Sequence, residues 1–194
     1  METTRNTRQT RSTRTEFHTA ADDTGKYIEG YFPVFDSNYE MFPGATESVA
    51  RTAFDGALPG DVRCLIDHET RLVLGRTKAD TLELRTDSHG LWGRVKINPL
   101  DQDAMNLYAR VERGDVDQCS FGFDILDEDM AVNERDGSVH WTIKSVRLYE
   151  VSVVTFPAYE DTAVAARKAD YSQIKKRSVE KWRLKKKEVL QKWH

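Results

Sequence analysis

The stretch Asp117–Leu126, DQCSFGFDIL, decides how the fold is predicted, because apolar and polar residues alternate along it. Such alternation is typical of a strand with one face in a hydrophobic core. The core face carries Cys119, Phe121, Phe123 and Ile125. The opposite face carries Gln118, Ser120, Gly122 and Asp124. We therefore expect Ser120 to point away from the core on a well-anchored strand, with Gly122 leaving room for a substrate backbone beside it.

Further strands are predicted on both sides of this stretch, because aromatic and β-branched residues recur between turn signals. They are expected at 27–35, 62–68, 81–86, 91–97, 140–143 and 145–155. Residues 36–60, which contain prolines and glycines, are predicted to form loop and short helix. Asp101 can cap an amphipathic helix that Gly114 can end. The pattern predicts an α+β fold that is mainly β, with a mostly antiparallel sheet or barrel.

Composition divides the chain of 194 residues into three parts. Residues 1–16 are dominated by Thr and Arg and are predicted to be a disordered N-terminal arm. Residues 17–166 are expected to form one folded domain, and 167–194 a basic, amphipathic helical tail. The tail has 11 Lys and Arg against 3 Asp and Glu, a formal charge of +8, which leaves −11 for residues 1–166. Such a tail can bind a nucleic acid, a membrane surface or an acidic protein.

Several classes of protein are disfavoured by what the sequence contains. It has no apolar run of the roughly 20 residues that a membrane-spanning helix requires, and no signal-peptide core. Its two cysteines are too few for a disulfide framework, and no Cys/His cluster has the spacing of a zinc site. No glycine-rich phosphate loop is present. We expect reduced thiols, no metal and no cofactor.

Three residues could together carry nucleophilic chemistry. Ser120 is a possible nucleophile, although a solvent-facing serine on an ordinary strand has the same pattern. His68 ends the apolar run DVRCLIDHE, and an imidazole there could act as a general base or could be an ordinary surface histidine. Glu150 shares a strand face with apolar residues, so its carboxylate should have a partner. That partner could be the imidazole, or an arginine such as Arg147 or Arg94.

Other candidates for these roles are weaker. Cys119 lies next to Ser120, but the alternation places its thiol in the core, where a cysteine tends to be inert. Asp67, Ser152 and His140 are rivals of Glu150 as the third member. The remaining histidines lie in predicted loops, turns and the tail and are less favourable: His18, His89 and His194.

Four blocks in order, GYFPVF, LIDHE followed by LGRT, GDVDQCSFGF and YEVSVVTFPAYEDT, resemble the caudovirus prohead protease family. The resemblance runs from about Ile28 to Arg167. These enzymes resemble the herpesvirus assemblins, which implies an antiparallel β-barrel with flanking helices. Carried over by motif, the nucleophile falls on Ser120, the general base on His68 and the acidic member on Glu150. Asp67 and Cys119 depart from the commoner Asn and Met of the family, and neither change alters the hydroxyl or the imidazole.

The resemblance also implies a biological role. It implies a serine endopeptidase inside the assembling prohead, in the host cytoplasm, that cleaves scaffold, extensions of the major capsid protein and itself. A homo-oligomer, such as a dimer, is expected by analogy. Residues 156–159 are expected to supply oxyanion-hole amides, and residues 167–172 an accessible self-cleavage site. The alternatives are a catalytically silent assembly scaffold and, disfavoured by the acidic body, a nucleic-acid-binding protein that uses the tail.

Overall fold

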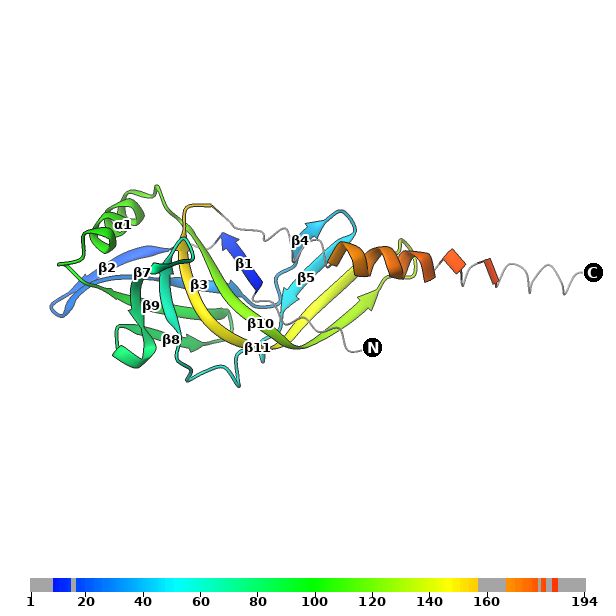
Figure 1. The fold of residues 1–194 in the computed structure, drawn as a ribbon, viewed down its shortest axis with the longest axis horizontal. Helices are drawn as coiled ribbons and strands as arrows, with labels where there is room; N and C mark the ends of the chain where they lie inside the picture. Colours follow the sequence, from blue (N-terminus) through cyan, green and yellow to red (C-terminus); the bar gives the residue numbers. More distant parts are fainter. Residues whose placement is uncertain (1–8, 15–16, 157–166, 178, 181–182, 185–194) are drawn as a thin grey trace, which may run out of the picture.

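The computed structural model describes residues 9–14, 17–156, 167–177, 179–180 and 183–184. Its described strands form two sheets (Figure 1). The seven-stranded sheet contains β1 (Gln9–Arg14), β4 (Tyr39–Phe42), β5 (Ala45–Val49), β6 (Arg63–Ile66), β7 (Glu69–Arg76), β10 (Gln118–Val132) and β11 (Val139–Val154). The four-stranded sheet contains β2 (His18–Asp22), β3 (Gly25–Val34), β8 (Leu82–Thr86) and β9 (Gly90–Ile97).

The long hairpin of β10 and β11 forms the centre of the larger sheet and runs along most of the body (Figure 1). Its turn includes Gly137, whose φ of 71° lies in the left-handed region that glycine adopts without strain. Strand β10 continues six residues beyond the predicted end at Leu126, and the two strands predicted between 140 and 155 are one strand. Register shifts within the hairpin let these long strands bend.

Strand β11 also pairs in parallel with two short strands, β5 along its first half and β6 along its second half. The other pairings among the described strands are antiparallel, as predicted. The prediction of loop and short helix over residues 36–60 was wrong in part, because β4 and β5 lie there. Their pairing with each other and with β11 outweighs the turn-forming residues around them.

The helix α1 (Gln102–Arg113) confirms the prediction made from its ends. The carboxylate of Asp101 accepts hydrogen bonds from the backbone N–H groups of Asp103 and Ala104, and Gly114 ends the helix at a φ of 83°. The buried face of α1 joins the main hydrophobic core. A 3₁₀ turn, η1 (Thr77–Ala79), connects β7 to β8.

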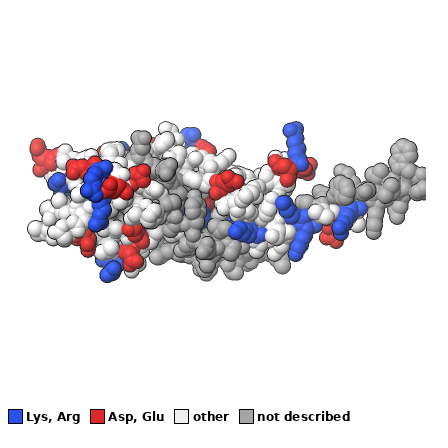
Figure 2. Space-filling view, turned by 90° about the horizontal axis from the view of Figure 1, so that it is seen from above, with Lys and Arg blue, Asp and Glu red and all other residues white. Residues whose placement is uncertain are grey.

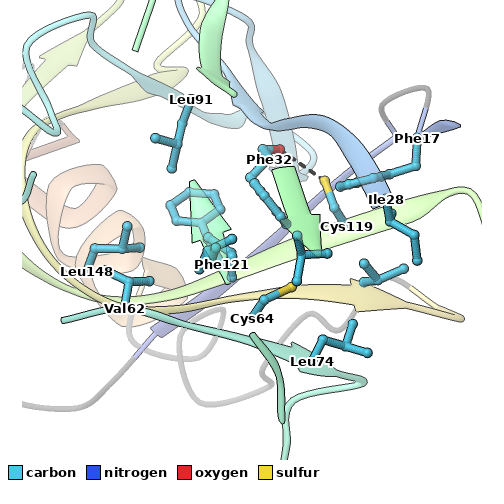
Figure 3. Packing of buried hydrophobic residues seen from close by; sticks show 14 of the residues in the cluster. Phe17, Ile28, Phe32, Val62, Cys64, Leu74, Leu91, Cys119, Phe121 and Leu148 are labelled. Carbon is cyan, nitrogen blue, oxygen red and sulfur yellow. Dashed lines mark hydrogen bonds between the residues drawn. The ribbon is translucent and has the colours of Figure 1, made fainter. Parts of the chain in front are cut away.

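The main core draws on both sheets, and Figure 3 shows Phe121 of β10 among side chains from several strands. A second, smaller cluster of Ala45, Val139 and Trp141 lies further along the hairpin, where Tyr171 and Ile174 of the tail pack against it. The mainly β, α+β class is confirmed. The barrel is not seen, because the described strands form two open sheets.

Two expectations about the ends of the chain were wrong in part. Residues 9–14 form β1, although their composition predicted disorder, because pairing with the edge of β10 supplies hydrogen bonds that composition does not reveal. Residues 167–177 are helical, as predicted, and residues 168, 169 and 172 are exposed, but Arg167 is only 2% exposed, so the accessible linker expected at 167–172 does not include its first residue. Figure 2 shows basic side chains gathered where the described part of the tail begins. Within the described residues, no helix is both long and apolar enough to cross a membrane.

Candidate functional site

Ser120 lies near the start of β10, between β1 on one side and β11 on the other. Its neighbours in register are Ser12 on β1 and Ser152 on β11. The side chain was expected to face away from the core, but it is not exposed, because the residue is fully buried. Its hydroxyl donates a hydrogen bond of 3.0 Å to the carbonyl oxygen of Arg11. The predicted nucleophile therefore meets a peptide carbonyl of its own chain.

His68 is held in a two-residue turn between β6 and β7, and not at the end of a strand as predicted. Asp67 and His68 have φ values of 47° and 61°, the left-handed conformations that a tight hairpin turn of this length requires. The carboxylate of Asp67 accepts hydrogen bonds from Thr155, at 2.7 Å from its backbone N–H and 3.1 Å from its hydroxyl. Asp67 therefore fixes the turn against the end of β11, and its carboxylate does not contact the imidazole as a third member would.

The imidazole of His68 contacts Glu150, with 2.9 Å between Nδ1 and Oε1. A carboxylate is acceptor-only when ionised, so this contact favours the tautomer with the proton on Nδ1. The other ring nitrogen, Nε2, is buried and has no hydrogen-bond partner. In that tautomer its lone pair is available to accept a proton.

Glu150 is itself held from a second side. It is 4% exposed, and the hydroxyl of Ser152 donates to its Oε2 at 2.5 Å. Gly122 lies opposite Glu150, and a Cβ at Gly122 would come within 2.2 Å of Oε1. The space beside Ser120 was expected to admit a substrate backbone, but the Glu150 side chain occupies it. Neither alternative arginine is among the described partners of Glu150: the described ion pairs of Arg94 go to Asp22 and Glu29, and Arg147 is exposed.

The strand register explains how these groups come together. Cross-strand partners share a face of the sheet, so Ser120, Ser152, Gly122 and Glu150 face the same way. Strand β6 pairs with the other side of β11, and its hairpin turn brings His68 to Glu150. Ser120, His68, Glu150 and Ser152 are called the histidine cluster below. Ser120 is not hydrogen-bonded to His68, since its described partner is the carbonyl of Arg11 and Nε2 has none.

The competing nucleophiles and acids have other structural roles. Cys119 is buried in the core, as predicted, and its thiol donates to the carbonyl oxygens of Tyr31 and Phe32, of which Figure 3 shows the bond to Phe32. Burial, and to a smaller extent the charge of Glu150, raises the pKa of the Cys64 thiol, so it stays protonated. The ring nitrogens of His140 contact hydroxyls of Thr46 and Ser48, each at 2.8 Å.

Of the remaining candidates, His18 contacts Glu29 at 3.0 Å on the surface. Residues 157–159 of the predicted oxyanion segment, and His194, lie outside the described residues. Among the residues that the structure describes, no group of His, Cys, Asp and Glu could hold a metal ion.

A second buried polar cluster lies on the same sheet and was missed by sequence reasoning. We call Arg11, Glu47, Glu128 and Arg167 the arginine cluster. Glu47 is 1% exposed and accepts hydrogen bonds from the guanidinium groups of Arg11 and Arg167. Arg167 also pairs with Glu128 at 2.6 Å and lies over the ring of Trp141. No pattern in the sequence predicts that these residues are in contact, because they come from four separate segments: β1, β5, β10 and the tail.

Known proteins support the relationship that the blocks suggested. The sequence profile of the family described as caudovirus prohead serine protease matches residues 13–177. The chain is 31% identical over 176 residues to the prohead protease of Enterobacteria phage HK97. The aligned region covers 87% of this chain and 72% of the HK97 protein. Superposition on the solved capsid assembly protease of bacteriophage T4 covers 75% of this chain and 98% of the T4 chain, at 11% identity. The TM-score of 0.43 does not establish a shared fold. On the family match and the HK97 relative, the chain belongs to the caudovirus prohead serine protease family.

Proposed function

We propose that this protease uses Ser120 as its nucleophile, His68 as general base and Glu150 as the carboxylate that orients the imidazole. The observation that carries the proposal is the 2.9 Å contact between His68 Nδ1 and Glu150 Oε1, with Nε2 buried and unpartnered. A buried polar atom without a partner costs free energy, and a functional role is one reason for such an atom to persist.

The reaction would proceed through an acyl-enzyme. Ser120 Oγ attacks a peptide carbonyl carbon while His68 Nε2 takes the hydroxyl proton, and Glu150 stabilises the imidazolium. The C–N bond then breaks, and the proton passes from Nε2 to the leaving amine. A water molecule attacks the ester, its proton passes through Nε2, and Oγ is released as a hydroxyl. Amides of residues 156–159 remain our prediction for the oxyanion hole.

The hydrogen bond of Ser120 differs from the one that the proposed reaction requires. The Ser120 hydroxyl donates to the carbonyl oxygen of Arg11, whereas attack requires its proton to be given to His68. For attack, the Ser120 hydroxyl would have to leave the Arg11 carbonyl and donate to His68 Nε2 instead. Catalytic hydrogen bonds commonly tighten only when substrate is bound productively.

We further propose the substrates and the setting. Membership of the family and the likeness to the HK97 protein support cleavage of scaffold and of extensions of the major capsid protein, inside the assembling prohead in the host cytoplasm. The contact between Ser120 and a carbonyl of its own chain supports self-cleavage. A homo-oligomer, such as a dimer, remains an expectation by analogy.

The test is intact-mass analysis of the wild type and of Ser120→Ala, incubated alone and with the cognate scaffold and capsid protein. Cleavage by the wild type that disappears in Ser120→Ala would support the assignment. Ser48→Ala is the matched control, because it removes another buried hydroxyl, the one that contacts His140. Equal cleavage by Ser120→Ala would overturn the nucleophile and direct attention to Cys119. Absence of cleavage in every mixture, including assembled proheads, would favour the silent scaffold.

A further inference from the structure

Strand β1 lies on β10 in the manner of a bound peptide. It forms the edge of the larger sheet next to β10 (Figure 1). The two strands pair antiparallel, with Ser12 opposite Ser120. Extended peptides are recognised in this way, with main-chain hydrogen bonds giving affinity and side chains giving specificity. The carbonyl oxygen 3.0 Å from Ser120 Oγ belongs to Arg11. The peptide bond between Arg11 and Ser12 is therefore the bond whose carbonyl meets the candidate nucleophile.

The side chain of Arg11 enters a site that matches a guanidinium. Glu47 accepts two hydrogen bonds from it, at 2.5 Å from Nε and 3.1 Å from Nη2. Two more hydrogen bonds stay within β1: Gln9 Oε1 and the carbonyl oxygen of Thr10 accept from Arg11 at 2.8 and 2.9 Å. The guanidinium carbon lies 5.7 Å from the ring centroid of Phe123. Of these groups, Glu47 and the Phe123 ring lie outside β1, and the two oxygens of Glu47 fit a planar, bidentate guanidinium better than a lysine ammonium.

The charges around this site would favour a second cation after Arg11 has left. Two carboxylates, Glu47 and Glu128, face two guanidinium groups, those of Arg11 and Arg167. Without Arg11 they would share the single guanidinium of Arg167, and Glu47 would be a buried carboxylate with half of its pairing lost. Burial by itself raises the pKa of Glu47, but the charges and hydrogen bonds of Arg11 and Arg167 lower it below its ordinary value. Glu47 is therefore an ionised acceptor.

We propose that β1 is the first substrate of this protease, cut between Arg11 and Ser12, and that Glu47 selects arginine on the N-terminal side of the cleaved bond in later substrates. The proposal rests on the function proposed above and names its specificity. In this first cut Oγ bonds to the Arg11 carbonyl carbon, the bond to the Ser12 nitrogen breaks, that nitrogen receives the proton from His68, and water releases residues 1–11.

The repeated arm offers a matched set of variants for the first experiment, because Arg8 and Arg14 stand three residues to either side of Arg11. The full-length wild type, Arg8→Ala, Arg11→Ala and Arg14→Ala are incubated and their intact masses are followed with time. Loss of residues 1–11 is expected in all but Arg11→Ala, which should lose them at least about 30-fold more slowly. A cut at another bond of the arm, or equal processing of Arg11→Ala, would overturn the assignment of β1 as substrate.

The second experiment separates specificity from folding. Quenched fluorescent peptides of residues 6–17 carry Arg8→Gln and Arg14→Gln, with Arg, Lys, Gln or Glu at position 11. The processed wild type should prefer Arg over Gln by about 100-fold in kcat/KM, and Glu47→Gln should reduce that ratio to about 10-fold or less. A folding defect would instead lower the rates on all peptides together. An unchanged ratio in a Glu47→Gln protein with native circular dichroism would refute the role of Glu47.

Failure of this inference is distinguishable from failure of the proposed function. Cleavage that depends on Ser120 but ignores arginine would leave the function standing and overturn the inference. Absence of all Ser120-dependent cleavage, together with no reaction of Ser120 with a fluorophosphonate in Arg11→Ala, would overturn both.

Discussion

The histidine cluster and the arginine cluster lie on the same sheet, and they differ in how completely their atoms are paired. In the histidine cluster, Glu150 is bonded on both oxygens while His68 Nε2 is left without a partner. In the arginine cluster, both oxygens of Glu47 and both oxygens of Glu128 accept hydrogen bonds from guanidinium groups. The difference indicates two uses of buried polar groups: an unpaired nitrogen next to an orienting carboxylate is available to accept a proton, and a closed set of charges serves stability or recognition.

The largest expected effect comes from removing His68 Nε2, the buried nitrogen without a partner. His68→Asn keeps a residue that tolerates the left-handed turn conformation but cannot accept a proton from Ser120. We expect a loss of about 1000-fold or more in cleavage rate, with little change in stability. Cleavage time courses and urea unfolding measure the two quantities.

The control for that substitution is His140→Asn, which alters the imidazole bonded to Thr46 and Ser48 on the other half of β11. Its cleavage rate should stay within a few-fold of the wild type. A similar loss in both variants would mean that the comparison does not separate a catalytic histidine from a structural one.

In the arginine cluster the expected effect is on stability. Arg167→Met removes a guanidinium that is 2% exposed and leaves Glu47 and Glu128 with less compensation. We expect the free energy of unfolding to fall by about 3 kcal/mol, measured by urea denaturation. Arg51→Met breaks an exposed ion pair with Asp36 and should change the free energy of unfolding by less than about 1 kcal/mol. Equal effects of the two substitutions would show that the closed cluster contributes no special stability.

The pH dependence of that stability should be smaller and has a definite sign. The folded-state pKa of Glu47 lies below its ordinary value of 4.5, because Arg11 and Arg167 outweigh the effect of burial. The stabilisation from its ionised form is therefore complete above the unfolded pKa and is lost as the pH falls through the folded pKa. Unfolding of the wild type and of Glu47→Gln between pH 7 and pH 3.5 should show a difference that shrinks below about pH 4.5. A difference that grows on acidification would contradict the lowered pKa.

The two clusters also differ in how far sequence reasoning could reach them. Alternation along β10 correctly placed Cys119 and the phenylalanines in the core, and the caps of α1 were visible as Asp101 and Gly114. The proximity of His68 and Glu150 came from the resemblance to a family, since the residues alone left an arginine partner equally open. The hairpin turn that carries His68 was missed, because two non-glycine residues at positive φ have no clear sequence signature.

The arginine cluster could not have been predicted by the same means. Arg11 lies in a polar arm without periodicity, and its partner Glu47 is 36 residues away in a segment read as loop. Strand β1 exists because β10 presents an unpaired edge, which is a property of the assembled sheet and not of residues 9–14. The burial of Ser120 was hidden for the same reason, since the alternation of β10 describes its two faces and says nothing of what lies on its edge.

The smallest expected effect tests whether the hydrogen bond from Ser152 to Glu150 affects the reactivity of His68 Nε2. Ser152 donates to Glu150 Oε2 and is our candidate positioning residue. Ser152→Ala should lower kcat by about 10-fold and leave KM nearly unchanged, because the hydroxyl orients Glu150 and does not contact substrate. Ser152→Thr retains the hydroxyl and should recover part of the loss. A rise in KM with constant kcat would instead place Ser152 in substrate binding. The hydrogen bond between Ser152 and Glu150 would then not affect proton transfer at His68 Nε2.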